Sequence, residues 1–175
     1  MMTLLPAHLR PIRKLVAAVA IVWAALIGYL LWAHGQLPEK VALHFNAEGK
    51  PNRWSSSSEM TLGMVLLATA EFVTFFAIAW ILPRISYQLW NLPNKSYWLA
   101  PERAEQTTTG ICRDLLIMGL ATLLLLGVVQ WDVVQANLVR AESNLVFTGW
   151  VVGSYLVLIC GIIVAMIKRF NRVGD

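Results

Sequence analysis

Charged residues are scarce in this sequence. Asp, Glu, Lys and Arg make up 14% of its 175 residues, whereas hydrophobic residues make up 58%. Soluble domains typically contain about 25% charged and 45–50% apolar residues, so the composition argues against a soluble fold. There are only two cysteines and three histidines, and none has the spacing of a zinc site. A nucleophile beside a base and a glycine-rich phosphate loop are also missing. We therefore predict no catalytic residues, no metal and no cofactor.

Long apolar runs are the main feature that is present. Residues 15–33, 115–131 and 145–167 carry no charge, and residues 60–82 carry only Glu71. About 20 apolar residues are enough for a helix to cross a bilayer. The sequence thus predicts an all-α membrane protein, a single domain of residues 1–175. Its four transmembrane helices are expected at about 14–34, 58–83, 111–131 and 145–168, with a small ordered outer cap at 35–57 and a cytoplasmic loop at 84–110.

The distribution of positive charge predicts the orientation in the membrane. The net charge is +4, but the basic residues do not form the single patch expected of a nucleic-acid binder. Ten of them lie before the first run, between the second and third, or after the fourth: Arg10, Arg13, Lys14, Arg84, Lys95, Arg103, Arg113, Lys168, Arg169 and Arg172. The other two loops hold Lys40, Lys50, Arg53 and Arg140. The positive-inside rule then predicts that both termini lie in the cytoplasm. The expected location is the inner membrane, crossed several times.

Two features inside the predicted helices bear on function. Glu71 lies near the middle of the second helix, where a carboxylate facing lipid would cost several kcal/mol. It is either a functional group that exchanges protons or holds a cation, or a neutral acid bonded to Thr122 or Ser154. Gly149 and Gly153 form a GxxxG pair that favours close helix packing, within the chain or with a partner such as a second copy.

The first loop has the pattern of an ordered structure. Val41, Leu43 and Phe45 alternate with polar or small residues, which predicts a short strand with one apolar face. Asn46 opens a turn with Gly49 at its fourth position. Ser56 and Glu59 have capping-box spacing, which predicts the start of the second helix. We expect a compact cap against the membrane face, pinned by Trp54.

Polar side chains on this cap leave two interpretations open. His44, Asn46, Glu48 and Asn52 include one histidine with carboxamides, a poor ligand set for a transition metal. His44 and Asn46 either hydrogen-bond backbone groups within the loop, or they take part in recognising an external partner.

The spacing of residues 37–54 resembles a known family. The matching residues are Leu37, Pro38, Val41, His44, Phe45, Asn46, Gly49, Pro51 and Trp54. They are similar to the signature of the membrane domain of unknown function 1648, at the N-terminal end of SdpI-type immunity and signalling proteins. Ala42 and Asn52 depart from that signature, where the family has a second proline and an acid. The resemblance implies an inner-membrane protein whose longer relatives confer resistance to a secreted toxic peptide and relay its presence to a cytoplasmic repressor.

The second loop contains aromatic and basic residues typical of the headgroup region. Pro101 and Glu102 are typical of a helix start, and a short helix is expected to begin there and to continue weakly through Thr107 to Gly110 towards the third membrane helix. The segment resembles one in other small members of the same family. It is either an interfacial anchor or a docking surface for a cytoplasmic partner, with candidate residues Asn94, Tyr97, Trp98, Pro101, Glu102 and Arg103.

Three functional classes follow from these patterns. The first is a non-enzymatic sensing or immunity protein whose cap, residues 37–54, binds a secreted peptide or lipid-like ligand. The second is a structural or accessory subunit of a larger membrane complex. The third, an enzyme or proton-coupled carrier centred on Glu71, has the least support, because no second acid or histidine continues a relay. The lipid bilayer is an expected partner, and nucleic acid is not.

Overall fold

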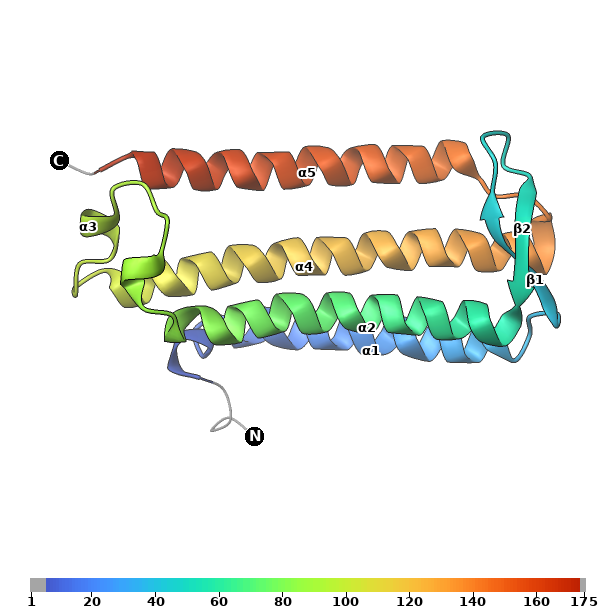
Figure 1. Cartoon of the computed structure of the whole chain (residues 1–175), viewed down its shortest axis with the longest axis horizontal. Helices are drawn as coiled ribbons and strands as arrows, with labels where there is room; N and C mark the ends of the chain where they lie inside the picture. Colours follow the sequence, from blue (N-terminus) through green and yellow to red (C-terminus); the bar gives the residue numbers. More distant parts are fainter. Residues whose placement is uncertain (1–5, 174–175) are drawn as a thin grey trace.

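Four long helices run back and forth along one axis in the computed structural model, which describes residues 6–173 (Figure 1). They are α1 (Arg13–His34), α2 (Ser57–Ile81), α4 (Ala104–Gln135) and α5 (Leu145–Asn171). Each is long and apolar enough to cross a membrane. The prediction of a mostly helical membrane protein with four candidate spans is therefore confirmed.

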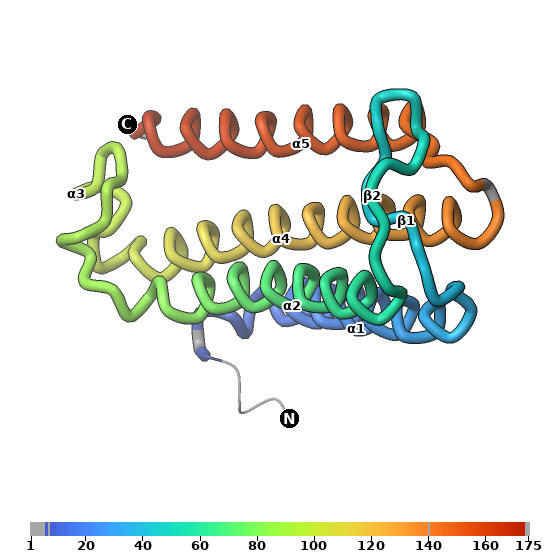
Figure 2. Tube along the Cα trace, turned by 45° about the vertical axis from the view of Figure 1, so that its right-hand side comes forward, coloured from blue at the N-terminus to red at the C-terminus, as the bar shows by residue number. Residues whose placement is uncertain are grey.

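The connections gather at the two ends of the bundle, as Figure 2 shows. At one end, called the hairpin end, β1 (Lys40–Phe45) and β2 (Pro51–Ser56) form an antiparallel pair. A π-helical segment, η4 (Ala136–Arg140), continues α4 at this end. The opposite end, called the loop end, holds the short helices η1 (Ala7–Leu9), η2 (Leu82–Arg84), η3 (Tyr87–Leu89) and α3 (Lys95–Trp98). The described chain starts and finishes at the loop end.

The buried core lies between α1, α2 and α4. Its members are Leu9, Val16, Val19, Leu26, Leu30, Ala68, Ala79, Cys112, Leu116 and Leu123. A row of aromatic side chains on α2, namely Phe72, Phe76 and Trp80, stacks along the helix. Trp23 of α1 stacks on Phe72 with ring centroids 4.9 Å apart. Close approach of α2 and α4 depends on Gly119, because a Cβ there would lie 2.8 Å from Cγ of Phe75. This glycine lets two backbones approach, as small residues do in membrane bundles.

Helix α5 is attached differently from the other three. It packs against α4 and makes no comparable contact with α1 or α2, and Figure 1 shows it set apart from them. Within its most apolar stretch no residue is buried inside the protein. One polar contact joins it to α4 at mid-length, between the Thr122 and Tyr155 hydroxyls at 3.0 Å. Gly149 and Gly153 have nothing within 4 Å of their Cβ positions, so this pair is not used inside the described chain.

Two observed boundaries differ from the expected ones. The third membrane helix was expected from residue 111, but α4 begins at Ala104 and includes the polar turns that precede the apolar run. Pro101 and Glu102 lie in the turn before α4, so no separate short helix begins there. The outer cap is a β-hairpin, a small exception to an all-α fold; the alternating pattern predicted its first strand but not its second.

Candidate functional site

The hairpin turn is built as its residue types predict. The Asn46 side-chain oxygen accepts hydrogen bonds from the backbone N–H groups of Glu48 and Lys50, at 3.1 and 2.9 Å. Gly49 has φ +79°, a conformation that residues with a Cβ rarely adopt. At the end of β2, Ser56 and Glu59 form the predicted capping box at the start of α2. Asn46 thus bonds the backbone, one of the two interpretations left open for it.

The faces of β1 do not follow simple alternation. Val41 and Ala42 are both buried, while Leu43 is 39% exposed. The register shifts between Ala42 and His44: these two residues pair with Trp54 and Arg53, which are adjacent in β2, so Leu43 has no partner. Such a bulge leaves one residue outside the ladder and turns the following side chains. The prediction that Leu43 shares a buried apolar face with Val41 is therefore wrong.

One side chain joins the hairpin to the helical bundle. Asn137 of η4 accepts a hydrogen bond from Ala42 N at 2.6 Å and donates one to Ala42 O at 2.9 Å. Its amide nitrogen also donates to Val133 O at 2.9 Å. A carboxamide can satisfy both backbone groups of one residue in this way, as a neighbouring strand would. Asn137 therefore takes the place of a third strand beside β1.

A second contact fixes the hairpin turn to the α4–α5 connection. The backbone N–H of Ser143 donates to Gly49 O at 3.0 Å, and a Cβ on Gly49 would lie 2.7 Å from Ser143 O. Asp132, 2% exposed, accepts from Ser143 Oγ at 2.5 Å and from Asn144 N at 3.2 Å. Asn144 in turn caps α5 by accepting from Phe147 N. The cap, the end of α4 and the start of α5 form one connected unit.

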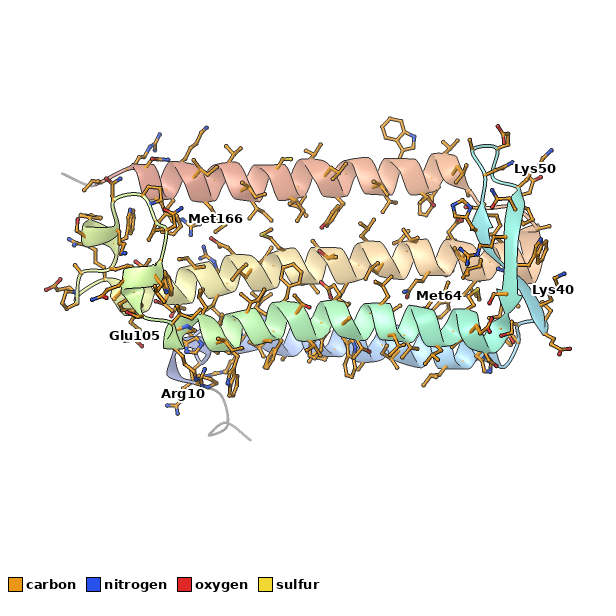
Figure 3. All side chains as sticks on the ribbon, viewed as in Figure 1. Arg10, Lys40, Lys50, Met64, Glu105 and Met166 are labelled. Atoms are coloured by element: carbon orange, nitrogen blue, oxygen red, sulfur yellow. The ribbon has the colours of Figure 1, made fainter. Side chains whose placement is uncertain are left out.

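The outer face of the hairpin is exposed and amphipathic. Trp54 is 50% exposed, and the Lys40 ammonium lies 5.7 Å from its ring centroid. Within the described chain, Asn137 and Ser143 make the hydrogen bonds that hold the hairpin to the helices, and the contact of Trp54 with the membrane face stays a prediction. A hollow of about 450 Å³ beside Trp54 is lined by Glu39, Lys40, Trp54, Ser55 and Ser56. Figure 3 shows Lys40 at the extreme hairpin end of the molecule.

The other cap residues lie around this face. The His44 ring donates through Nδ1 to the Asn52 side chain at 2.7 Å, so it bonds a side chain and not the backbone. Pro38 is exposed before β1. Pro51 begins β2 and is paired with Phe45, and both are half-buried. Within residues 6–173, no three His, Cys, Asp or Glu side chains are placed to hold a metal ion.

Glu71 lies inside the bundle without a polar neighbour. Both of its carboxyl oxygens are buried and have no hydrogen-bond partner among the described residues. The expected bond to Thr122 or Ser154 is not made; the Thr122 hydroxyl contacts Met118 O and the Tyr155 hydroxyl. An unpaired buried carboxyl is costly and favours the neutral form in an apolar site.

At the loop end, two predicted residues bind the terminus of α5. The carbonyl oxygen of Phe170 accepts from Asn94 Nδ2 at 3.0 Å and from Trp98 Nε1 at 3.1 Å. The last carbonyl groups of a helix have no N–H donor within the helix. The two bonds from Asn94 and Trp98 use both lone pairs of the Phe170 oxygen. Asn94 has φ 51°, the left-handed conformation that asparagine tolerates. Both side chains therefore serve an internal contact.

A basic cluster lies next to this contact. The Arg103 guanidinium is 4.1 Å from the Tyr97 ring centroid. Asp114, 4% exposed, accepts from Arg113 at 3.0 Å and from Arg169 of α5 at 2.7 Å. A carboxylate shared by two guanidiniums from two helices is well satisfied. Together with the Phe170 contact, it fastens the end of α5 to α4.

The residues that hold both ends together were not among the predicted site residues. Asp114 and Asp132 are the charges that bound the apolar run of the third helix, at 115–131. Each makes a contact to the polar end of α5 or its connection. An acid at a membrane boundary is expected to have a partner at the same depth, so this position in the sequence is the signal that could have identified them. Asn137, beyond the run, carries no comparable signal.

Residues 20–69 match the family model of a domain of unknown function, DUF1648. The matched part spans the second half of α1, the hairpin and the first half of α2. It includes the hollow beside Trp54 but not Asn137 or Ser143. The resemblance predicted from residues 37–54 is confirmed at the level of this domain. No curated protein and no solved structure matches the chain significantly.

Proposed function

We propose that this is a non-enzymatic sensing or immunity protein of the bacterial inner membrane, whose hairpin binds a secreted peptide or lipid-like ligand. The observation that carries the proposal is the division of the hairpin into two faces. One face is bonded to α4 through Asn137, while the other presents Leu43 and Trp54 to the outside. An exposed aromatic beside a hollow is a common anchor point in recognition.

The ligand chemistry follows from the residues around the hollow. Lys40 near the Trp54 ring offers a cation next to an apolar surface, while Glu39, Ser55 and Ser56 add a carboxylate and two hydroxyls. An extended peptide or a lipid-like molecule with an apolar part and polar or charged groups of both signs fits this combination. The likeness of residues 37–54 to SdpI-type immunity proteins supports the same choice, because those proteins respond to a secreted peptide.

The proposed orientation has the hairpin outside and both termini in the cytoplasm. Ten of the fourteen Lys and Arg residues lie at the predicted cytoplasmic side, and positive charge is retained on that side of membranes. Ligand binding at the hairpin would then be passed to α4 through Asn137 and to α5 through Ser143. Both contacts are at the junction of the hairpin with the α4–α5 connection.

Affinity purification of the tagged protein in a mild detergent, followed by mass spectrometry of everything retained, tests this proposal. A small molecule or short peptide should be retained by the wild type and lost in Trp54→Ala and Leu43→Ser. Val139→Ser is the matched control, because Val139 is a 77% exposed apolar residue at the same end but outside the hairpin. Equal retention by all four proteins would contradict ligand binding at the hairpin.

The open face of α5 favours a second candidate, an accessory subunit of a membrane complex or a homodimer. Gly149 and Gly153 lie on a helix with one neighbour in the described structure, and small residues at this spacing suit close helix contact. The same purification distinguishes the two functions. A stoichiometric membrane protein or second copy that is lost in Gly149→Leu, but kept in Trp54→Ala, would identify the accessory role.

A further inference from the structure

A large apolar cavity lies at the loop end, away from the hairpin. Its volume is about 580 Å³, and its walls come from the 82–93 segment, α4 and α5. Lining side chains include Leu82, Leu92, Ile111, Leu115, Ile163 and Met166. The volume falls within the roughly 300–1,000 Å³ typical of small-molecule sites. Figure 3 shows Met166 on the side of α5 that faces α4.

Such a space needs an apolar occupant. No charged residue lines it, and Trp90 and Asn91 are the polar residues among its lining, so water filling most of this space would lack the two to four polar partners that hold a buried water. Empty space would deprive the lining side chains of dispersion contacts. An acyl chain from the surrounding bilayer meets both conditions. The cavity is lined by the 82–93 segment and by residues near the loop-end termini of α4 and α5. If the four helices cross the bilayer along their common axis, this is the depth of a lipid's upper chain and headgroup.

The segment that covers the cavity also has the chemistry of a headgroup site. Trp90 lines the cavity, and its Nε1 is buried with no hydrogen-bond partner among the described residues. An indole N–H can only donate, so its missing partner must be an acceptor. Residues 82–101 contain two cations, Arg84 and Lys95, and no acid. Neither lines the cavity: the Lys95 ammonium donates to Gln88 O at 2.7 Å, and the Arg84 guanidinium lies 5.2 Å from the Trp80 ring centroid. The segment that borders the cavity is therefore basic, which favours an acceptor that carries negative charge.

We propose that this cavity binds an anionic phospholipid from the bilayer, with an acyl chain between α4 and α5. The lipid's ester or phosphate oxygens accept from Trp90 Nε1, and Arg84 and Lys95 select the negative headgroup. The site is at the opposite end of the molecule from the hairpin hollow and does not depend on the ligand proposed there. Its occupant fills the gap beside α5 that the protein's own side chains leave open.

Native mass spectrometry from nanodiscs of palmitoyl-oleoyl phosphatidylglycerol and phosphatidylcholine tests the site. Each Lys or Arg near an anionic surface contributes roughly a fivefold factor, so about 30-fold tighter retention of phosphatidylglycerol is expected. The double variant Arg84→Gln/Lys95→Gln should abolish this preference while a lipid is still bound. Because Arg84 bonds Trp80 O and Lys95 bonds Gln88 O, the melting temperature of this variant is measured alongside, and glutamine can keep a donor at each position. Equal preference in wild type and double variant would overturn the assigned headgroup site.

Two further variants test the position of the chain. Ile163→Trp fills the cavity and should reduce retention of both lipids, whereas Leu156→Trp, on an exposed part of α5, should not. Trp90→Phe removes the unpaired N–H and part of the ring, and should weaken retention; its melting temperature, measured beside that of Tyr87→Leu, which alters the same ring contact but keeps the N–H, separates loss of the donor from loss of packing. If glycerol 3-phosphate in solution displaces the bound species, the site takes a soluble phosphate and the lipid proposal is wrong. Unchanged retention in Ile163→Trp would likewise overturn it.

Discussion

Replacing Glu71 with leucine should stabilise the protein. The wild-type side chain has two buried oxygens without partners, and an unsatisfied buried polar group costs about 1–3 kcal/mol. Leucine removes both oxygens and keeps a similar volume, so a gain of about 2 kcal/mol in the free energy of unfolding is expected. For a chain of this length that corresponds to a rise of roughly 4–8 °C in melting temperature. Glu71→Gln retains two unsatisfied polar groups and should melt close to the wild type.

Thermal melts in a mild detergent, followed by loss of the monodisperse peak in size-exclusion chromatography, measure this effect. Thr74→Leu is the matched control, since Thr74 lies on the same helix but is exposed, and its hydroxyl already donates to Ala70 O at 2.7 Å. That variant should shift the melting temperature little. If Glu71→Leu melts below the wild type, or cannot be purified folded, the carboxyl makes a stabilising contact and the reasoning about its unpaired oxygens is refuted.

Three other perturbations follow from single contacts. Asn137→Ala leaves the buried backbone of Ala42 without its partners, which should cost about 1–3 kcal/mol and increase hydrogen exchange in β1. Gly119→Val places a side chain against Phe75 and should lower the melting temperature through overpacking of about 1–3 kcal/mol. The pKa of His8 lies below its ordinary value of 6.5, because of burial and then the nearby Arg84 charge. Stability should therefore fall as the pH drops below about 6.5, and His8→Gln should remove that part of the pH dependence.

The sign of the His8 effect comes from its neutral form in the folded protein. Its Nε2–H donates to Ala79 O at 3.1 Å, and the unfolded chain takes up a proton first as the pH falls. Equal slopes of melting temperature against pH in wild type and His8→Gln would contradict this. Wild-type exchange rates in β1 of Asn137→Ala, or an unchanged melting temperature in Gly119→Val, would show that those contacts contribute little.

Local signals in the sequence predicted much of the fold. The apolar runs predicted four candidate spans, because each run is about as long as a helix must be to cross the bilayer. The capping box at Ser56 and Glu59 and the Asx turn at Asn46 are also local, because each involves residues within four positions of one another. Helix before residue 111 was expected from Pro101 and Glu102, but not that it would be continuous with the membrane helix from Ala104, because polar turns can continue a helix without any apolar pattern.

Long-range contacts were not predictable in the same way. Asn137 and Ala42 are 95 positions apart. Nothing in the sequence around an asparagine that follows an apolar run indicates which distant residue it bonds. Leu43 was expected on the same apolar face as Val41, yet the register shift between Ala42 and His44 leaves Leu43 39% exposed while Ala42 is buried. A single residue of register decides which side of a strand is buried, and the alternating pattern alone did not contain that shift.

The placement of α5 outside the buried core has a consequence for how the chain is assembled during synthesis. Every residue of the core cluster lies between Leu9 and Leu123, so all of them are synthesised before α5. The fourth helix is held to this unit by the Ser143 and Asn144 contacts to Asp132, by the Thr122–Tyr155 contact and by the Arg169 contact to Asp114. We therefore expect the three-helix core to form without α5, which then joins it as helices associate in membranes.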